Sequence, residues 1–216
     1  MLIVFSGTDG AGKSTQIEKL SNKLTLDGKQ TVYLWSRGGY TPLISYFKKI
    51  VRKLLGNKLP KAGQSKNRDV MLEKKSVSSI WLFLAIVDLI LLYGIYVRFL
   101  RVTGKVVICD RYVQDTYLDF KNNFPNGFNS ESLLWKFLKF LAPEPNVSYL
   151  LFVPVKVSQE RSLLKNEPFP DSEETLVFRL KNYLDENIFP STKYIKIDCQ
   201  KPIDEIHQEI IKELNS

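Results

Sequence analysis

The chain has 216 residues with an ordinary apolar content of 44%, which suits one α/β domain, expected to span residues 1–216. Two cysteines, Cys109 and Cys199, are too few for a disulfide framework. We expect both to be buried, reduced thiols, and we expect a cytoplasmic protein because the amino terminus lacks the basic region of a signal peptide.

The formal charge of +8 is unevenly distributed along the chain. Residues 37–75 hold eleven Lys or Arg residues against Asp69 and Glu73, a net charge of +9 for that segment alone. Such a region predicts an anionic partner, such as nucleotide phosphates or a lipid surface, although a solvated helix face is the simpler interpretation. Nucleic acid is not expected, because aromatic residues do not alternate with the basic ones.

Close to the amino terminus, residues 7–15 match the pattern G-x-x-x-x-G-K-[ST] between an apolar strand, 2–6, and an amphipathic helical segment. In this setting the glycines allow backbone N–H groups to converge on phosphate oxygens at the positive end of a helix. Lys13 is expected to reach the β- and γ-phosphates, and the Ser14 hydroxyl to bind Mg²⁺. The residues expected to hold ATP are Gly7, Asp9, Gly10, Ala11, Gly12, Lys13, Ser14 and Thr15.

Strand-like and helical segments alternate along the rest of the chain. Strands are predicted at residues 2–6, 30–35, 105–109, 147–153 and 192–198. This alternation predicts the α/β class: a parallel five-stranded sheet with helices on both faces, a three-layer sandwich. Ligands of such sheets bind beyond the carboxyl ends of the strands, where residues 36–39 and 110–112 follow the second and third strands.

Residues 80–97 form an apolar run interrupted only by Asp88. Its length is close to the lower limit for a membrane span, but a central carboxylate makes insertion costly. We therefore expect a long central helix packed on the sheet, one face of which could form a homodimer interface. Asp88 is either paired inside the protein or accepts hydrogen bonds from substrate hydroxyls, and the sequence leaves both interpretations open.

The third predicted strand ends in Asp110, followed by Arg111 and Tyr112. In phosphate-loop enzymes an Asp at this point lies near Mg²⁺ or its water shell. Arg111 can offer a planar guanidinium to a phosphate or form a structural ion pair, for which Asp9 is a candidate. Tyr112 could stack on a base, although aromatic residues near strand ends are more often core.

Together, the phosphate-loop residues 6–15, Arg37 with two glycines after the second strand, and the Asp-Arg-Tyr triplet 110–112 resemble the thymidylate kinase family. A helix with Phe178, Arg179 and Tyr183 extends the likeness. By this resemblance the fold is that of a P-loop kinase, and the protein transfers the γ-phosphoryl group of Mg·ATP to dTMP.

The resemblance also implies roles for single residues. Those at the catalytic centre would be Lys13, Asp9, Arg111 and Arg161; those near the acceptor would be Arg37, Asp88, Asp110, Arg111 and Tyr112; and those near the metal would be Ser14 and Asp110. Residues 161–172 would form a lid over the phosphates, with Arg179 adding positive charge, and 198–201 would lie near the adenine.

Three departures keep other functions open. The lid has few basic residues, and the central helix lacks the Arg that hydrogen-bonds to thymine in this family. The segment 41–79 is also unusually long and basic. A kinase of a sugar or lipid-linked alcohol, with Asp9 or Asp110 as base, is one alternative, in which a basic helix at 43–55 would make peripheral contact with a membrane. A slow ATP-binding switch or interaction protein is the other.

Overall fold

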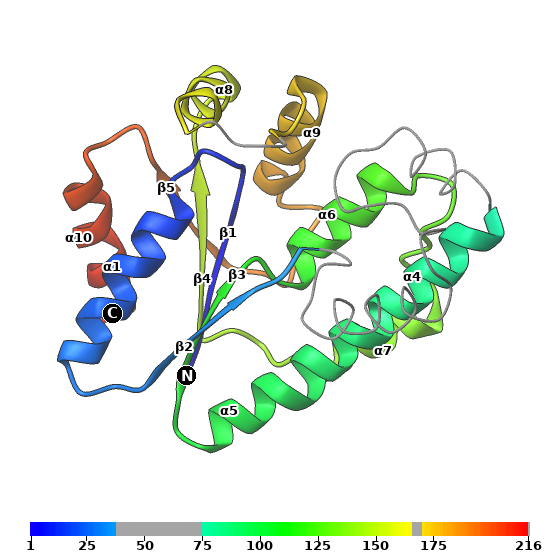
Figure 1. The fold of residues 1–216 in the computed structure, drawn as a ribbon, viewed down its shortest axis with the longest axis horizontal. Coiled ribbons are helices and arrows are strands. Elements are labelled where there is room, and N and C mark those ends of the chain that lie inside the picture. Colours follow the sequence, from blue (N-terminus) through cyan, green and yellow to red (C-terminus); the bar gives the residue numbers. More distant parts are fainter. Residues whose placement is uncertain (38–74, 166–169, 216) are drawn as a thin grey trace, which may run out of the picture.

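The computed structural model describes residues 1–37, 75–165 and 170–215, and its centre is a five-stranded parallel sheet (Figure 1). The strands follow the spatial order β2-β3-β1-β4-β5. Their bounds are β1, Leu2–Gly7; β2, Thr31–Trp35; β3, Val106–Asp110; β4, Val147–Phe152; and β5, Tyr194–Asp198. The predicted fold class is confirmed, and each strand begins and ends within two residues of its predicted position.

The central strand β1 is buried along its whole length because it has a neighbour on either side and helices above and below. It pairs with β3 so that Phe5 lies opposite Asp110, and with β4 so that Gly7 lies opposite Leu151. Parallel pairing places the carboxyl ends of these strands at one edge of the sheet. The phosphate loop and the Asp-Arg-Tyr triplet therefore lie at the same edge.

Two helical layers enclose the sheet. One face is covered by α1, Lys13–Leu26, and α10, Ile203–Leu214, which pack together over a core that includes Ile17, Leu20 and Ile210. The other face carries a long helix and α6, Val113–Asn123; α7, Leu133–Leu141, packs against that helix. Two further helices, α8, Val155–Leu164, and α9, Glu173–Leu184, lie beyond the carboxyl ends of the strands (Figure 1).

The long helix consists of α4, Lys75–Leu89, a π-helical segment η2, Ile90–Val97, and α5, Arg98–Val102. Residues 78–102 are long and apolar enough to cross a membrane, yet half of their most apolar window is buried inside the protein. The buried half packs on the sheet through Ala85, Leu89 and Tyr93, as expected of a core helix. The π-helical turns place the Tyr93 hydroxyl in a hydrogen bond with Ser36, just after β2.

Some predictions fall on residues 38–74 and 166–169, outside the described residues. Most of the basic segment 41–79, the helix at 43–55 and the middle of the lid are among them. Both ends of the predicted lid are described: Arg161 lies within α8, and Ser172 caps α9 by accepting a hydrogen bond from the Thr175 amide. Both cysteines are buried free thiols.

Candidate active site

The phosphate loop joins the end of β1 to the first turn of α1. Gly7 has a φ of +135°, and a side chain there would overlap the carbonyl oxygen of Leu151 on β4. Gly12 is the left-handed residue before α1, and its carbonyl accepts the first helical hydrogen bond from the Gln16 amide at 3.1 Å. As the N-cap residue, Gly12 has no side chain with which to cap this helix. Its first N–H groups are thus left for a ligand, as a phosphate site requires.

Gly7→Ala tests whether this close approach is necessary. We expect the free energy of unfolding to fall by about 2–5 kcal/mol and the binding free energy of ATP to weaken by a similar amount. The new methyl group must displace the backbone of β4, and the alanine must adopt a disfavoured φ. Gly28→Ala is the matched control. Gly28 also has a positive φ but open space around it, so urea unfolding should report only about 1 kcal/mol there. Equal losses in both variants would contradict the steric argument.

Lys13, the first residue of α1, is buried and folds back over the loop. Its Nζ donates hydrogen bonds to the carbonyl oxygens of Gly7, at 3.0 Å, and Thr8, at 2.7 Å. Burial and then the nearby Arg111 guanidinium lower the pKa of Lys13, while Asp9 and Asp110 oppose that shift. Nucleotide phosphate oxygens could replace the two carbonyl acceptors, which are neutral, with charged acceptors in direct contact with the ammonium group.

Asp9 and Arg111 form the ion pair for which the sequence made Asp9 a candidate. Arg111 Nη2 donates to Asp9 Oδ1, and Arg37 Nη1 lies 3.7 Å from the other carboxylate oxygen. Burial alone would raise the pKa of Asp9, but the Arg111 guanidinium, followed by Lys13, Arg179 and Arg37, holds it well below its usual range. Asp9 is therefore an acceptor of hydrogen bonds and a poor proton acceptor.

Arg111 itself is held in an uncommon conformation. Its φ of 78° makes it the one residue other than glycine with a positive φ in the described chain. The backbone N–H donates to the Phe5 carbonyl at 2.9 Å, while the buried Nη1 makes no hydrogen bond within the described residues. A strained backbone that aims a partly unsatisfied guanidinium at the phosphate loop is typical of a functional site.

A divalent cation would find suitable oxygen ligands here. Asp110 is buried at the end of β3, where Oδ2 accepts a hydrogen bond from the Tyr33 hydroxyl at 3.2 Å and Oδ1 has no hydrogen-bond partner within the described residues. Ser14, in the first turn of α1, is exposed. One carboxylate, one hydroxyl and nucleotide phosphates match the way Mg²⁺ is bound in proteins. In the described part of the chain, three-residue clusters of acidic, His or Cys ligands are absent.

Arg37 and Arg179 extend the array of charges away from the loop. Arg179, from α9, is buried and lies 2.6 Å from Asp119 of α6 and 3.2 Å from Asp171. Asp171 also accepts a 2.7 Å hydrogen bond from Arg37, just after β2. Three guanidinium groups and three carboxylates thus alternate between the phosphate loop and α9. In order, this array consists of Arg111, Asp9, Arg37, Asp171, Arg179 and Asp119. Such an array offers an anionic ligand several charge-assisted hydrogen bonds.

Arg161 ties two segments of the nucleotide side together. Its Nη1 donates to the Gly10 carbonyl at 3.1 Å, and its Nη2 donates to the Cys199 carbonyl at 2.9 Å. Ser158, one turn earlier on α8, donates to the Asp9 carbonyl at 2.5 Å. Helix α8 thereby holds the phosphate loop against the loop after β5, the segment expected near the adenine.

Two predicted acceptor residues lie deeper. Tyr112 is buried, its ring centroid is 4.4 Å from that of Tyr93, and its hydroxyl donates to the Pro143 carbonyl at 2.8 Å. These contacts place the Tyr112 side chain in the core. Asp88 is buried in α4, two residues before the π-helical segment. Contact of either residue with an acceptor remains a prediction.

Sequence reasoning did not find Asp119 or Asp115 as parts of this edge of the sheet, and it included Asp171 in the lid without finding its arginine partners. Asp115 Oδ2 accepts hydrogen bonds from the Ser6 hydroxyl at 2.6 Å and the Tyr112 amide at 2.9 Å, and its Oδ1 accepts one from the Tyr183 hydroxyl at 2.5 Å. Asp119 and Arg179 are sixty residues apart. No local pattern indicates such pairs.

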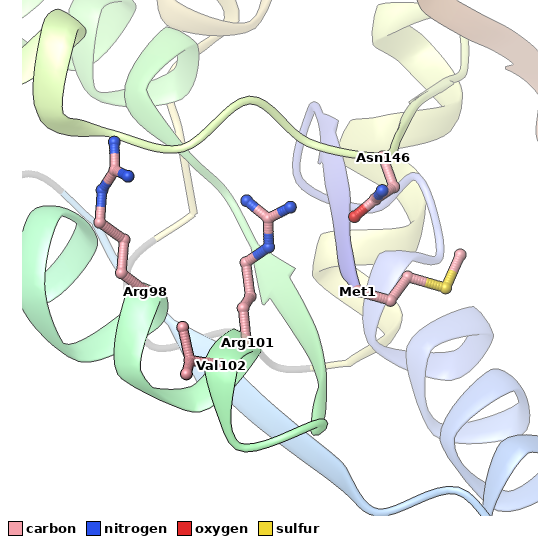
Figure 2. A pocket seen from close by; sticks show the side chains of 5 residues that line it. All are labelled: Met1, Arg98, Arg101, Val102 and Asn146. Carbon is pink, nitrogen blue, oxygen red and sulfur yellow. The ribbon is translucent and has the colours of Figure 1, made fainter.

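A separate hollow of about 360 Å³ lies at the opposite edge of the sheet (Figure 2). Met1, Arg98, Arg101, Val102 and Asn146 line it. Met1, Val102 and Asn146 precede β1, β3 and β4, so this hollow is separated from the phosphate loop by the length of the strands. It is not part of the candidate active site.

The parallel sheet, the phosphate loop and the basic side chains facing it define a P-loop kinase. Comparison with models of protein families finds no match. The chain is 30% identical over 219 residues to a probable thymidylate kinase of Thermococcus kodakarensis, covering 98% of this chain and 95% of that protein. It is 26% identical to the thymidylate kinase of Desulfotalea psychrophila, covering 99% of this chain and 93% of that protein. It is also 26% identical to the thymidylate kinase of Fervidobacterium nodosum, covering 100% of this chain and 99% of that protein. The chain belongs to the thymidylate kinase family.

Proposed function

We propose that the protein transfers the γ-phosphoryl group of ATP to dTMP, giving ADP and dTDP. The observation that supports this most directly is the position of Arg37 and Arg111 beside Asp9 of the phosphate loop. Two guanidinium groups close to the donor's binding loop suit an acceptor that itself carries a phosphate. The thymidylate kinases to which the chain is similar along almost its whole length support dTMP as that acceptor.

In the proposed reaction an oxygen of the acceptor phosphate forms a bond to the γ-phosphorus. The bond from that phosphorus to the β–γ bridging oxygen breaks, and its electron pair remains on ADP. The attacking phosphate is already ionised near neutral pH, so no side chain has to remove a proton. Lys13, Arg111 and Arg37 would hold donor and acceptor in line and compensate their negative charge.

Mg²⁺ would be held by the Ser14 hydroxyl and near the Asp110 carboxylate, and would neutralise phosphate charge when bound. The Asp110 Oδ1, which lacks a hydrogen-bond partner among the described residues, supports this assignment. Arg161 would act from the nucleotide side by keeping Gly10 and Cys199 in place.

The alcohol-kinase alternative requires a carboxylate that accepts a proton at neutral pH. Asp9 fits that role poorly because Arg111 holds its pKa so low. A panel of acceptors decides between the functions: dTMP, other nucleoside monophosphates, thymidine and sugars are each incubated with Mg·ATP while ADP release is followed. Turnover with dTMP supports the proposal. Turnover only with an alcohol, or ADP release that no acceptor stimulates, contradicts it.

Arg37→Ala should raise the KM for dTMP about 10- to 100-fold with a smaller effect on kcat, because it removes a charge-assisted hydrogen bond to the acceptor phosphate. Steady-state kinetics at saturating ATP measure both constants. The exposed Arg98, which lines the hollow at the other edge of the sheet, provides the control variant Arg98→Ala. An unchanged KM for Arg37→Ala would remove Arg37 from the acceptor site.

We further propose that the protein is a cytoplasmic homodimer formed through the long helix. Its exposed side carries apolar residues at helical spacing: Ile80, Phe83, Leu84, Leu91, Ile95, Phe99 and Val102. A second copy is favoured over a membrane because the opposite side of the same helix is packed on the sheet, so the helix cannot insert without leaving the core.

The double variant Phe83→Lys/Phe99→Lys should halve the mass measured by light scattering after size-exclusion chromatography. Two charges in an apolar interface carry a desolvation cost that the free surface does not impose. Leu26→Lys, at an exposed apolar residue of α1, is the control and should leave the mass unchanged. A wild-type protein that is already monomeric, or a dimeric double variant, contradicts the proposed interface.

A further inference from the structure

The carboxylate of Asp171 lies between two guanidinium groups at the acceptor side of the candidate site. Its Oδ1 accepts a hydrogen bond from Arg37 Nη2 at 2.7 Å, and its Oδ2 is 3.2 Å from Arg179 Nη1. The Asp171 side chain is 8% exposed and that of Arg179 is 3% exposed, while Arg37 keeps 30% of its side-chain surface in solvent. Arg37 is therefore the member of this group that a ligand can reach.

The three carboxylates of the array differ in the element to which they belong and in their other ion-pair partners. Asp9 belongs to the phosphate loop and pairs with Arg111, and Asp119 belongs to α6 and pairs with Arg179 at 2.6 Å. Asp171 belongs to neither a helix nor a strand and directly precedes Ser172, the cap of α9. Its carboxylate can leave Arg37 without disturbing the sheet, and it still has Arg179 as a partner.

Carboxylate and phosphate oxygens use the same donors of an arginine. A planar guanidinium binds either anion through its N–H groups, and a phosphate dianion brings more charge and more acceptor oxygens. In the structure, Asp171 takes the Nη2 donor of Arg37, the group assigned above to the acceptor phosphate. The two anions thus compete for one site.

We propose that Asp171 is an internal competitor of the acceptor phosphate: it neutralises Arg37 in the empty enzyme, and the phosphate of the acceptor displaces it. The inference relies on the proposed function in taking Arg37 as the phosphate-binding residue. Asp171 is a positioning residue that touches no reacting atom. The acceptor phosphate can bind only those molecules in which Arg37 is free of Asp171, so the apparent affinity for the acceptor is lower than the intrinsic affinity. After the transfer, the return of Asp171 to Arg37 favours release of the product.

The first experiment measures binding without ATP, so that it is independent of turnover. Inorganic phosphate and dTMP are titrated calorimetrically into the wild type, Asp171→Asn and Asp119→Asn. Asp171→Asn should bind both ligands about three- to tenfold more tightly, the range expected for removing a charged competitor from a partly exposed arginine. Asp119→Asn removes a buried carboxylate from the same Arg179 but does not contact Arg37, so it should bind phosphate no more tightly than the wild type.

The second experiment locates the effect at Arg37. In an Arg37→Ala background, the further change Asp171→Asn should bring no gain in phosphate affinity, because no guanidinium is released. Thymidine, which has no phosphate, should bind wild type and Asp171→Asn equally. With Mg·ATP, Asp171→Asn should lower the KM for dTMP rather than raise kcat.

Several results would overturn the inference. One is a folded Asp171→Asn that binds phosphate no better than the wild type, or not at all at millimolar concentration. Another is a gain that persists without Arg37. Asp171→Ser gives the same neutral test with a smaller side chain; if circular dichroism shows that neither variant folds, the carboxylate is architectural and the inference fails. A lack of turnover with dTMP would refute the proposed function. The phosphate titration would still show whether Asp171 competes with phosphate for Arg37.

Discussion

Lys13→Ala should reduce kcat/KM for phosphoryl transfer by about 10³-fold or more, equivalent to about 4 kcal/mol of transition-state stabilisation. The ammonium group is buried beside the phosphate loop, where its charge is poorly screened by water. In the transfer reaction this charge would face oxygens that gain negative charge as the bridging bond breaks. Coupled measurement of ADP release with dTMP, together with calorimetric titration of Mg·ATP, separates loss of rate from loss of binding.

Lys19→Ala is the matched control for this experiment. Lys19 belongs to the same helix, but its side chain is exposed and forms a surface ion pair with Asp204 at 2.9 Å. Surface ion pairs contribute little, so activity should stay close to that of the wild type. Thermal melts of both variants show whether loss of the Lys13 hydrogen bonds to Gly7 and Thr8 unfolds the loop. Full activity of a folded Lys13→Ala would contradict the assignment of the phosphate loop.

Arg179→Met should lower the free energy of unfolding by about 3–5 kcal/mol, because it leaves Asp119 as a buried carboxylate without its cation. For a chain of this length that corresponds to a fall in Tm of about 10 °C. The loss of Arg179 should contribute less to this destabilisation through Asp171, because that carboxylate keeps its ion pair with Arg37. Urea unfolding followed by circular dichroism measures the change.

Arg98→Met is the control for that prediction, because Arg98 is exposed and its Nε donates to the Leu141 carbonyl at 3.0 Å. We expect a change below about 1 kcal/mol for this variant. The triple variant Asp119→Asn/Asp171→Asn/Arg179→Met should regain much of the lost stability, since no buried charge is then left unpaired. Equal stability of Arg179→Met and the wild type would mean that water reaches this array.

The alternation of strands and helices along the chain, the sheet edge at which ligands are expected, and the phosphate-loop motif were all predictable from the sequence. These features are local: buried strands are continuous apolar runs, and the loop is defined by glycines and a lysine within nine residues. The Asp9–Arg111 pair was also within reach, because the phosphate loop and the triplet 110–112 both follow strands of a parallel sheet.

The partners of the remaining charges became known from the folded structure alone. Asp119 and Arg179 meet because α6 and α9 pack together, and Asp171 joins them from just before α9. Nothing in the local sequence of one helix specifies the charge opposite it on another. The same applies to Tyr112, whose side chain the packing of η2 and β3 places in the core. Burial and ion pairing over long sequence separations depend on how the elements pack, because the free energy of a charge is set by the groups that surround it in space.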